Sequence, residues 1–155
     1  MKCFNYDIVC QEIPDEVTLA LNISGCPNKC PGCHSPWLAG DEGVALNENF
    51  INLLINKYIS GLTCVCFMGG DQNPAEINRL ASYIKATFPQ LKTAWYSGLI
   101  ELSDAIDVLN FDYIKVGPYI EEKGGLRSPN TNQKFYKVLR GGKLEQVRFA
   151  PKNSF

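Results

Sequence analysis

Short apolar segments alternate with helix-forming segments along most of this chain, and this alternation is the feature that most constrains its fold. Four apolar segments have the length of buried strands: 17–23, 62–68, 91–96 and 112–116. Such an order favours βαβ units and a mostly parallel sheet. A chain of 155 residues has room for about four to six such units, too few for a closed eight-fold barrel. We therefore expect an α/β fold built as an open partial (βα) barrel.

The segments between these strands carry helix signals. Residues 47–59 place apolar side chains at helical spacing behind Asn47, a favourable N-cap. The run Asn73-Pro74-Ala75-Glu76 is a strong helix start, and Pro89 ends that helix. The sequence also predicts a short helix over 99–109 and one or two strands within 135–149.

Length and composition favour one domain over residues 1–155, with 1–16 as an N-terminal extension or hairpin and 119–134 as a polar loop. The net charge is −1, and the absence of a basic excess argues against nucleic acid as a partner. The sequence contains no run of 18 apolar residues, so we expect no membrane span. The N-terminus lacks the apolar core of a signal peptide, which predicts a soluble, cytoplasmic protein.

Chemistry-bearing residues follow each predicted strand. A cysteine-rich loop follows the first strand, Gly69-Gly70-Asp71 the second, Tyr96-Ser97-Gly98 the third and Gly117-Pro118 the fourth. Ligands of such sheets bind beyond the carboxyl ends of the parallel strands. All four segments should therefore meet at one edge of the sheet.

The cysteine-rich loop spans residues 25–34 and places Cys26, Cys30 and Cys33 at Cys-x3-Cys-x2-Cys spacing. Three clustered thiols with no fourth nearby indicate a metal centre that keeps one position open, and an open position favours chemistry over a structural role. Iron–sulfur cubanes normally take four thiolates, so three would leave one iron for a small molecule. Structural zinc is the alternative, but it normally takes four ligands, and His34 directly adjoins Cys33.

These motifs resemble those of the radical S-adenosylmethionine (SAM) enzymes. The cysteine spacing after a first strand and Gly69-Gly70-Asp71 after the second, in place of a Gly-Gly-Glu motif, carry the resemblance. The run 30–34, the segments 95–98 and 112–119, and the run 130–134 are most similar to the small activating enzymes of anaerobic ribonucleoside-triphosphate reductases. Asp71 is one methylene shorter than Glu, Gly32 replaces a common aromatic residue, and Val116 replaces a common polar one.

The resemblance implies a partial barrel of the radical SAM type with a [4Fe-4S] cluster on Cys26, Cys30 and Cys33. SAM would bind the open iron, and its one-electron reductive cleavage would give a 5′-deoxyadenosyl radical that takes hydrogen from a glycine of the partner reductase. No catalytic side chain is expected beyond that cofactor-derived radical. The expected SAM-binding residues are Gly69, Gly70, Asp71, Tyr96, Ser97 and His34.

The implied partners are an anaerobic ribonucleoside-triphosphate reductase and a reductant such as flavodoxin or ferredoxin. Three alternatives stay open: another glycyl-radical activase, another small radical SAM enzyme such as a deazaguanine-type synthase, and a non-enzymatic iron–sulfur or zinc module. A short chain leaves little material to enclose a small substrate, which favours a protein substrate.

Several residues also have purely structural interpretations. Cys64 and Cys66 lie two apart on one strand and are expected to pack in the core. Cys3 and Cys10 are expected in an N-terminal hairpin, and Lys115 is expected to end its strand toward solvent. Trp95 and Tyr96 have a structural alternative as core aromatics.

Overall fold

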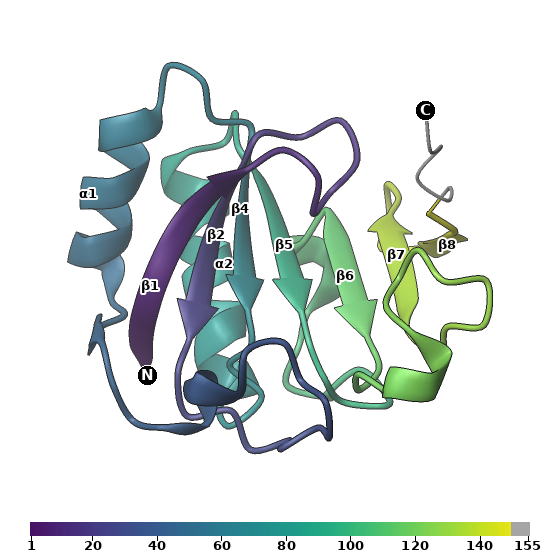
Figure 1. Cartoon of the computed structure of the whole chain (residues 1–155). Helices are drawn as coiled ribbons and strands as arrows, with labels where there is room; N and C mark the ends of the chain where they lie inside the picture. Colours follow the sequence, from purple (N-terminus) through teal and green to yellow (C-terminus); the bar gives the residue numbers. More distant parts are fainter. Residues whose placement is uncertain (150–155) are drawn as a thin grey trace.

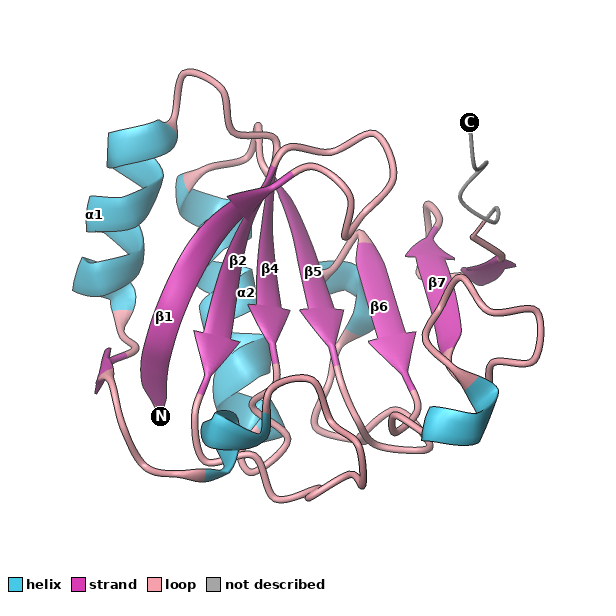
Figure 2. Cartoon of the chain, viewed as in Figure 1, coloured by secondary structure: helices cyan, strands magenta, loops and turns pink. Residues whose placement is uncertain are grey.

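A computed structural model describes residues 1–149 of the chain as one mixed sheet with two helices on one face (Figures 1 and 2). The strands are β1 (Lys2–Val9), β2 (Thr18–Ile23), β3 (Val44–Ala45), β4 (Cys64–Met68), β5 (Lys92–Tyr96), β6 (Tyr113–Val116), β7 (Lys134–Val138) and β8 (Leu144–Val147). The helices are α1 (Glu48–Tyr58) and α2 (Pro74–Thr87), and three short 3₁₀ turns are η1 (Pro36–Ala39), η2 (Val108–Asn110) and η3 (Glu121–Lys123).

The strands of the sheet lie in the order β3-β1-β2-β4-β5-β6-β7-β8. The pairs β2–β4, β4–β5 and β5–β6 are parallel, as the alternation of strands and helices predicts. Antiparallel strands extend both sides, with β1 and β3 beside β2, and β7 and β8 beside β6. The α/β class is therefore confirmed, the described sheet is mixed, and its closer description as a partial barrel of the radical SAM type stays a prediction.

Both faces of the sheet are covered, which explains the continuous apolar runs of the central strands. On one face, α1 and α2 bury a cluster with alternate residues of the central strands, including Leu21, Phe67 and Trp95. The opposite face carries a smaller cluster that includes Cys66, Tyr96 and Phe135. This second face is the one on which the inner cavity described below lies.

The two predicted helix starts are confirmed. The Asn47 side chain accepts a hydrogen bond from the Phe50 backbone N–H at 2.9 Å, and that of Asn73 accepts one from Glu76 N–H at 3.2 Å. The residues 135–149, expected to hold one or two strands, contain most of β7 and all of β8.

The short helix predicted over 99–109 is wrong, because this connection consists of turns and the 3₁₀ turn η2. The side chain of Ser103 accepts a hydrogen bond from the Ala105 backbone, and that of Asp107 accepts one from the Leu109 backbone. These local bonds replace helical ones. Among the described helices, none is long and apolar enough to cross a membrane.

Candidate metal centre

The parallel strands β2, β4, β5 and β6 all end at the same edge of the sheet, at the bottom of the view in Figure 1, and the cysteine-rich loop follows β2 there. The predicted convergence at this edge is confirmed, because one cavity of about 430 Å³ has lining residues from all four strand ends. Cys26, Cys30 and Cys33 all line it. We call it the cysteine cavity.

The backbone of the loop is held in place at several points. Cys26 N–H donates to the Leu38 carbonyl at 2.9 Å, and Gly25 N–H donates to the Gly40 carbonyl at 2.7 Å. All three cysteines are free thiols and partly exposed. The Cys33 sulfur accepts a hydrogen bond from Ser35 N–H at 3.4 Å. Hydrogen bonds of this kind to ligand sulfurs tune iron–sulfur centres.

The donor set fits a cluster of several irons. Within residues 1–149, no three His, Cys, Asp or Glu side chains are grouped tightly enough to hold a metal ion. A cubane takes one thiolate for each iron, so its protein ligands stand apart around a bulky centre. Cys26, Cys30 and Cys33 all line one cavity of about 430 Å³, so the three thiols that a cubane with one open iron needs border the same space.

Asp71 is 8% exposed and ties the cysteine-rich loop to the strand ends. One carboxylate oxygen accepts a hydrogen bond from the Ser97 hydroxyl at 2.6 Å. The other accepts from Gly98 N–H at 2.8 Å and from the Asn28 amide at 2.5 Å. Asn28 lies between the first two cysteines, so this carboxylate joins the loop to the end of β5. A carboxylate has about four acceptor positions, and three are already used.

The two glycines before Asp71 have different surroundings. Gly69 lines the cysteine cavity, and its carbonyl accepts a hydrogen bond from the Trp95 indole at 2.7 Å. Gly70 has a φ of +89°, and a Cβ there would lie 2.5 Å from Ile77 Cδ1 of α2. Gly70 is therefore required for packing against α2, a reason independent of any ligand.

Gly32, the residue before the last loop cysteine, has a conformational explanation. Its φ is +72°, a backbone conformation that residues with a side chain rarely adopt, so an aromatic residue at this position would be strained. A Cβ would also meet the exposed side chain of Glu121 in η3, but that side chain has room to move.

Tyr96 and Ser97 lie at the end of β5, and both are buried. Ser97 is engaged with Asp71 and lines neither the cysteine cavity nor the neighbouring one. The Tyr96 hydroxyl donates to the Glu12 carbonyl, and burial raises the pKa of Tyr96. Its ring lines the neighbouring cavity.

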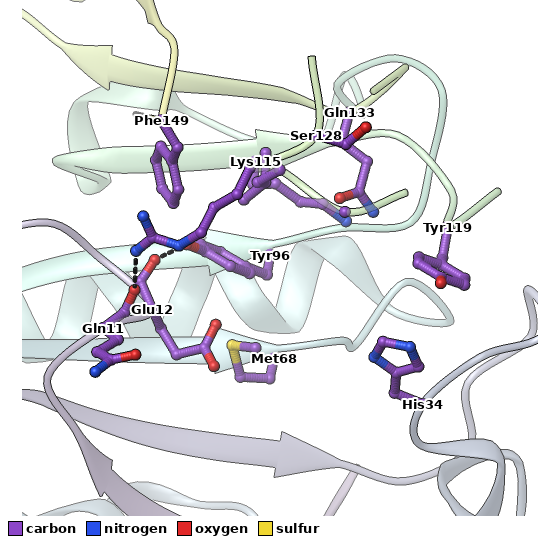
Figure 3. Close-up of a pocket in the computed structure, with 13 residues that line it drawn as sticks. Gln11, Glu12, His34, Met68, Tyr96, Lys115, Tyr119, Ser128, Gln133 and Phe149 are labelled. Atoms are coloured by element: carbon purple, nitrogen blue, oxygen red, sulfur yellow. Dashed lines mark hydrogen bonds between the residues drawn. The ribbon is translucent and has the colours of Figure 1, made fainter. Parts of the chain in front are cut away.

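That neighbouring cavity has a volume of about 470 Å³, and we call it the inner cavity (Figure 3). It shares Lys115, Tyr119 and Gln133 with the cysteine cavity, so the two adjoin. His34 lines it and packs against Tyr119 with ring centroids 4.9 Å apart. In Figure 3 these two rings lie at one end of the cavity and Phe149 lies at the other.

Lys115, Tyr119 and Asn28 are among the residues of the site for which the sequence predicted no role there. Lys115 does not point into solvent: it is 8% exposed and lines both cavities. The alternation of side chains along a strand could have indicated this position. Lys115 lies two residues after Tyr113 in β6, so both side chains are on the same face of the sheet. Asn28 gave no signal beyond its place in the loop.

The remaining cysteines match their structural interpretations. Cys64 and Cys66 are fully buried in the second core cluster, and burial raises the pKa of both thiols. Cys3 lies in β1, which pairs with β2 as a hairpin, and burial raises its pKa to about 11. Cys10 follows β1 and is exposed.

Residues 16–124 match the family described as the 4Fe-4S single cluster domain. This match covers most of the chain and includes the whole cysteine-rich loop. The chain belongs to this family. Membership gives it an iron–sulfur cofactor of the 4Fe-4S type and agrees with the donor set of the cysteine cavity.

This member of the 4Fe-4S single cluster domain family is also 38% identical, over 87 residues, to the anaerobic ribonucleoside-triphosphate reductase-activating protein of Enterobacteria phage T4. The aligned part is 50% of this chain and 53% of the phage protein, so the match spans about half the length of that relative. No solved structure matches the chain.

Proposed function

We propose that this protein is a radical SAM activase that generates a glycyl radical on an anaerobic ribonucleoside-triphosphate reductase. The observation that carries the proposal is the meeting of three loop thiols with the Gly69–Asp71 turn at one cavity. The likeness to the phage T4 activating protein supports the choice of substrate.

In this proposal Cys26, Cys30 and Cys33 each bind one iron of a [4Fe-4S] cluster, and the fourth iron is left for SAM. When bound, such a cluster would supply the one electron needed for reductive cleavage of SAM, and the radical chemistry that follows would act on a glycine of the reductase. The protein holds the loop through Asp71 and limits the access of water through the walls of the cavity.

SAM has a polar amino-acid end and an aromatic base, and the adjoining cavities offer both environments. Gly69 and the free acceptor position of Asp71 suit the amino-acid end. The rings of His34, Tyr96 and Tyr119 suit contact with the base in the inner cavity. Gly70 and Ser97, engaged elsewhere, act by supporting these walls. Electrons would come from a carrier such as flavodoxin or ferredoxin.

The test is anaerobic reconstitution of the protein with iron and sulfide, followed by addition of SAM, dithionite and an anaerobic ribonucleoside-triphosphate reductase. We expect 5′-deoxyadenosine to form and a glycyl-radical doublet to appear in the EPR spectrum. Both signals should be lost in Cys26→Ala, Cys30→Ala and Cys33→Ala. The matched control is Cys10→Ala, an exposed cysteine outside the loop, which should keep both.

Each of the other outcomes would point to a different function. Stoichiometric zinc without sulfide would refute the proposal in favour of a zinc module. SAM cleavage that persists in the three loop variants would remove the cysteines from the site. SAM cleavage with no radical on the reductase would favour a small-molecule substrate, for which the inner cavity of about 470 Å³ has room.

A further inference from the structure

In the described part of the chain, Lys115 is a buried cation with no carboxylate among its hydrogen-bond or ion-pair partners. It is the last but one residue of β6, near the edge of the sheet where the cysteine cavity lies, and it is 8% exposed. Its ammonium group donates hydrogen bonds to the Ser97 carbonyl at 3.0 Å and to the Gly117 carbonyl at 2.9 Å. An ammonium group has three donors, and within residues 1–149 the third has no hydrogen-bond acceptor. A buried charge is costly unless something compensates it, so this position calls for an explanation.

The surroundings of Lys115 show where compensation comes from. It lines both the cysteine cavity and the inner cavity, and Figure 3 shows it between Phe149 and the Tyr119 end. Burial lowers the pKa of Lys115 to about 8, while negative charge on Asp71 and on the loop cysteines Cys30 and Cys26 acts in the opposite direction. The Asp71 carboxylate already accepts three hydrogen bonds, which leaves the loop cysteines as the other source of negative charge beside Lys115.

We propose that the Lys115 ammonium compensates the negative charge of the cluster and raises its one-electron reduction potential. The inference rests on the proposed cluster at Cys26, Cys30 and Cys33. Reduction adds one electron, supplied by an external one-electron donor, and makes the centre more negative. A fixed cation in a poorly solvated site stabilises that reduced form more than the oxidised one. Lys115 acts through the cluster and is therefore a positioning residue.

Lys29 provides a matched comparison within the same cavity. It also lines the cysteine cavity, but unlike Lys115 it is exposed to solvent. Water and salt screen exposed charges strongly. A neutral residue at position 29 should therefore change the potential much less than one at position 115.

The experiment is an EPR-monitored redox titration of the reconstituted full-length protein without SAM. The variants are Lys115→Gln, which keeps a donor for the two carbonyls, Lys115→Met, Lys115→Arg and the control Lys29→Met. We expect both neutral variants at 115 to lower the ratio of reduced to oxidised cluster at least tenfold at a fixed potential. For a one-electron couple, this change corresponds to a reduction potential lower by about 59 mV. Lys115→Arg should keep most of the wild-type potential.

A purely structural role predicts different results. An unchanged potential in Lys115→Gln or Lys115→Met, with wild-type iron and sulfide content, overturns the inference and leaves the proposed function standing. A shift of the same size in Lys115→Arg also overturns it, because that variant keeps the charge. If the wild-type protein binds no iron and sulfide, the proposed function fails first and the inference fails with it.

Discussion

The carboxylate of Asp71 stabilises the structure of the site in addition to any contact with a ligand. Its three hydrogen bonds join the cysteine-rich loop, through Asn28, to Ser97 and Gly98 at the end of β5. The sequence suggested Asp71 as a group that accepts from SAM. The structure adds a role before any ligand arrives, because the same carboxylate fixes the loop that carries the thiols.

We expect Asp71→Asn to loosen the cysteine-rich loop even in the protein without cluster. The new amide N–H₂ would face at least one of the three donors, and a buried donor left unpaired costs about 1–3 kcal/mol. Hydrogen exchange of the amides in 25–35 should become faster, with α2 unaffected. Asp41→Asn is the control, because that exposed carboxylate only pairs with Lys2 at the surface. Equal exchange in both variants would contradict the anchoring role.

A second residue-scale prediction concerns Glu16, a buried carboxylate at the end of the sheet opposite the site. It accepts hydrogen bonds from Lys92, from the Thr63 hydroxyl at 2.6 Å and from the Tyr113 hydroxyl at 2.8 Å. Burial by itself raises the pKa of Glu16, but these hydrogen bonds outweigh burial and hold the pKa below its ordinary value. We expect Glu16→Gln to lower the free energy of unfolding at pH 7 by about 2 kcal/mol.

The pH dependence of this effect has a definite direction. A lowered folded-state pKa contributes stability above the unfolded value of about 4.3, and that stability is lost as the pH falls through the folded value. The difference between wild type and Glu16→Gln in urea unfolding should therefore shrink below pH 4. Glu145→Gln, at an exposed position of β8, should show no such difference at any pH. If the difference in free energy of unfolding between wild type and Glu16→Gln persists at acidic pH, packing rather than charge explains the loss of stability.

At the scale of elements, helices with clear end signals were predictable and the β5–β6 connection was not. α1 and α2 begin where Asn47 and Asn73 indicated, because a capping side chain satisfies backbone N–H groups locally. The segment 99–109 has apolar residues at plausible spacing, yet Asp107 N–H donates to the Asn78 side chain on α2 at 2.8 Å. Such a tertiary bond is invisible in the sequence.

The edges of the sheet show the same limit. Alternating strand and helix signals identified the four parallel strands, whereas the pairing of β1 and β3 depends on contacts between residues such as Lys2 and Ala45 that are far apart in sequence. The candidate site was predictable to the level of strand ends for the same reason, since topology alone brings them together. The buried position of Lys115 and the contacts of Asn28 required the packed structure.

The capping role of Asn47 can be tested against a neighbouring asparagine of α1. We expect Asn47→Ala to destabilise the protein by about 1 kcal/mol, because the Phe50 N–H loses its acceptor. Asn49→Ala, at an exposed position in the same helix, should be neutral or slightly stabilising, because alanine has the higher helix propensity. Thermal unfolding followed by circular dichroism measures both. Equal losses in the two variants would show that Asn47 does not act as a cap.

At the scale of the whole molecule, the site and the core occupy separate regions. The two core clusters contain none of the loop cysteines, and η1 in the cysteine-rich region buries none of its residues. The fold therefore does not depend on the metal centre for its hydrophobic core, in contrast to small domains whose metal site supplies the folding free energy.

Replacing all three loop cysteines by serine should therefore leave the cluster-free protein folded. We expect the triple variant Cys26→Ser, Cys30→Ser, Cys33→Ser to unfold cooperatively within about 0.5 kcal/mol of the wild-type apoprotein, or ~2 °C in thermal midpoint, because partly exposed positions tolerate such changes. The matched control is Cys66→Ser, which makes the same change at a fully buried position and should cost about 1–3 kcal/mol. Calorimetry under anaerobic, metal-free conditions measures both. Loss of cooperative unfolding in the triple variant would mean that the cysteine-rich loop supports the fold, and the separation of site and core would have to be abandoned.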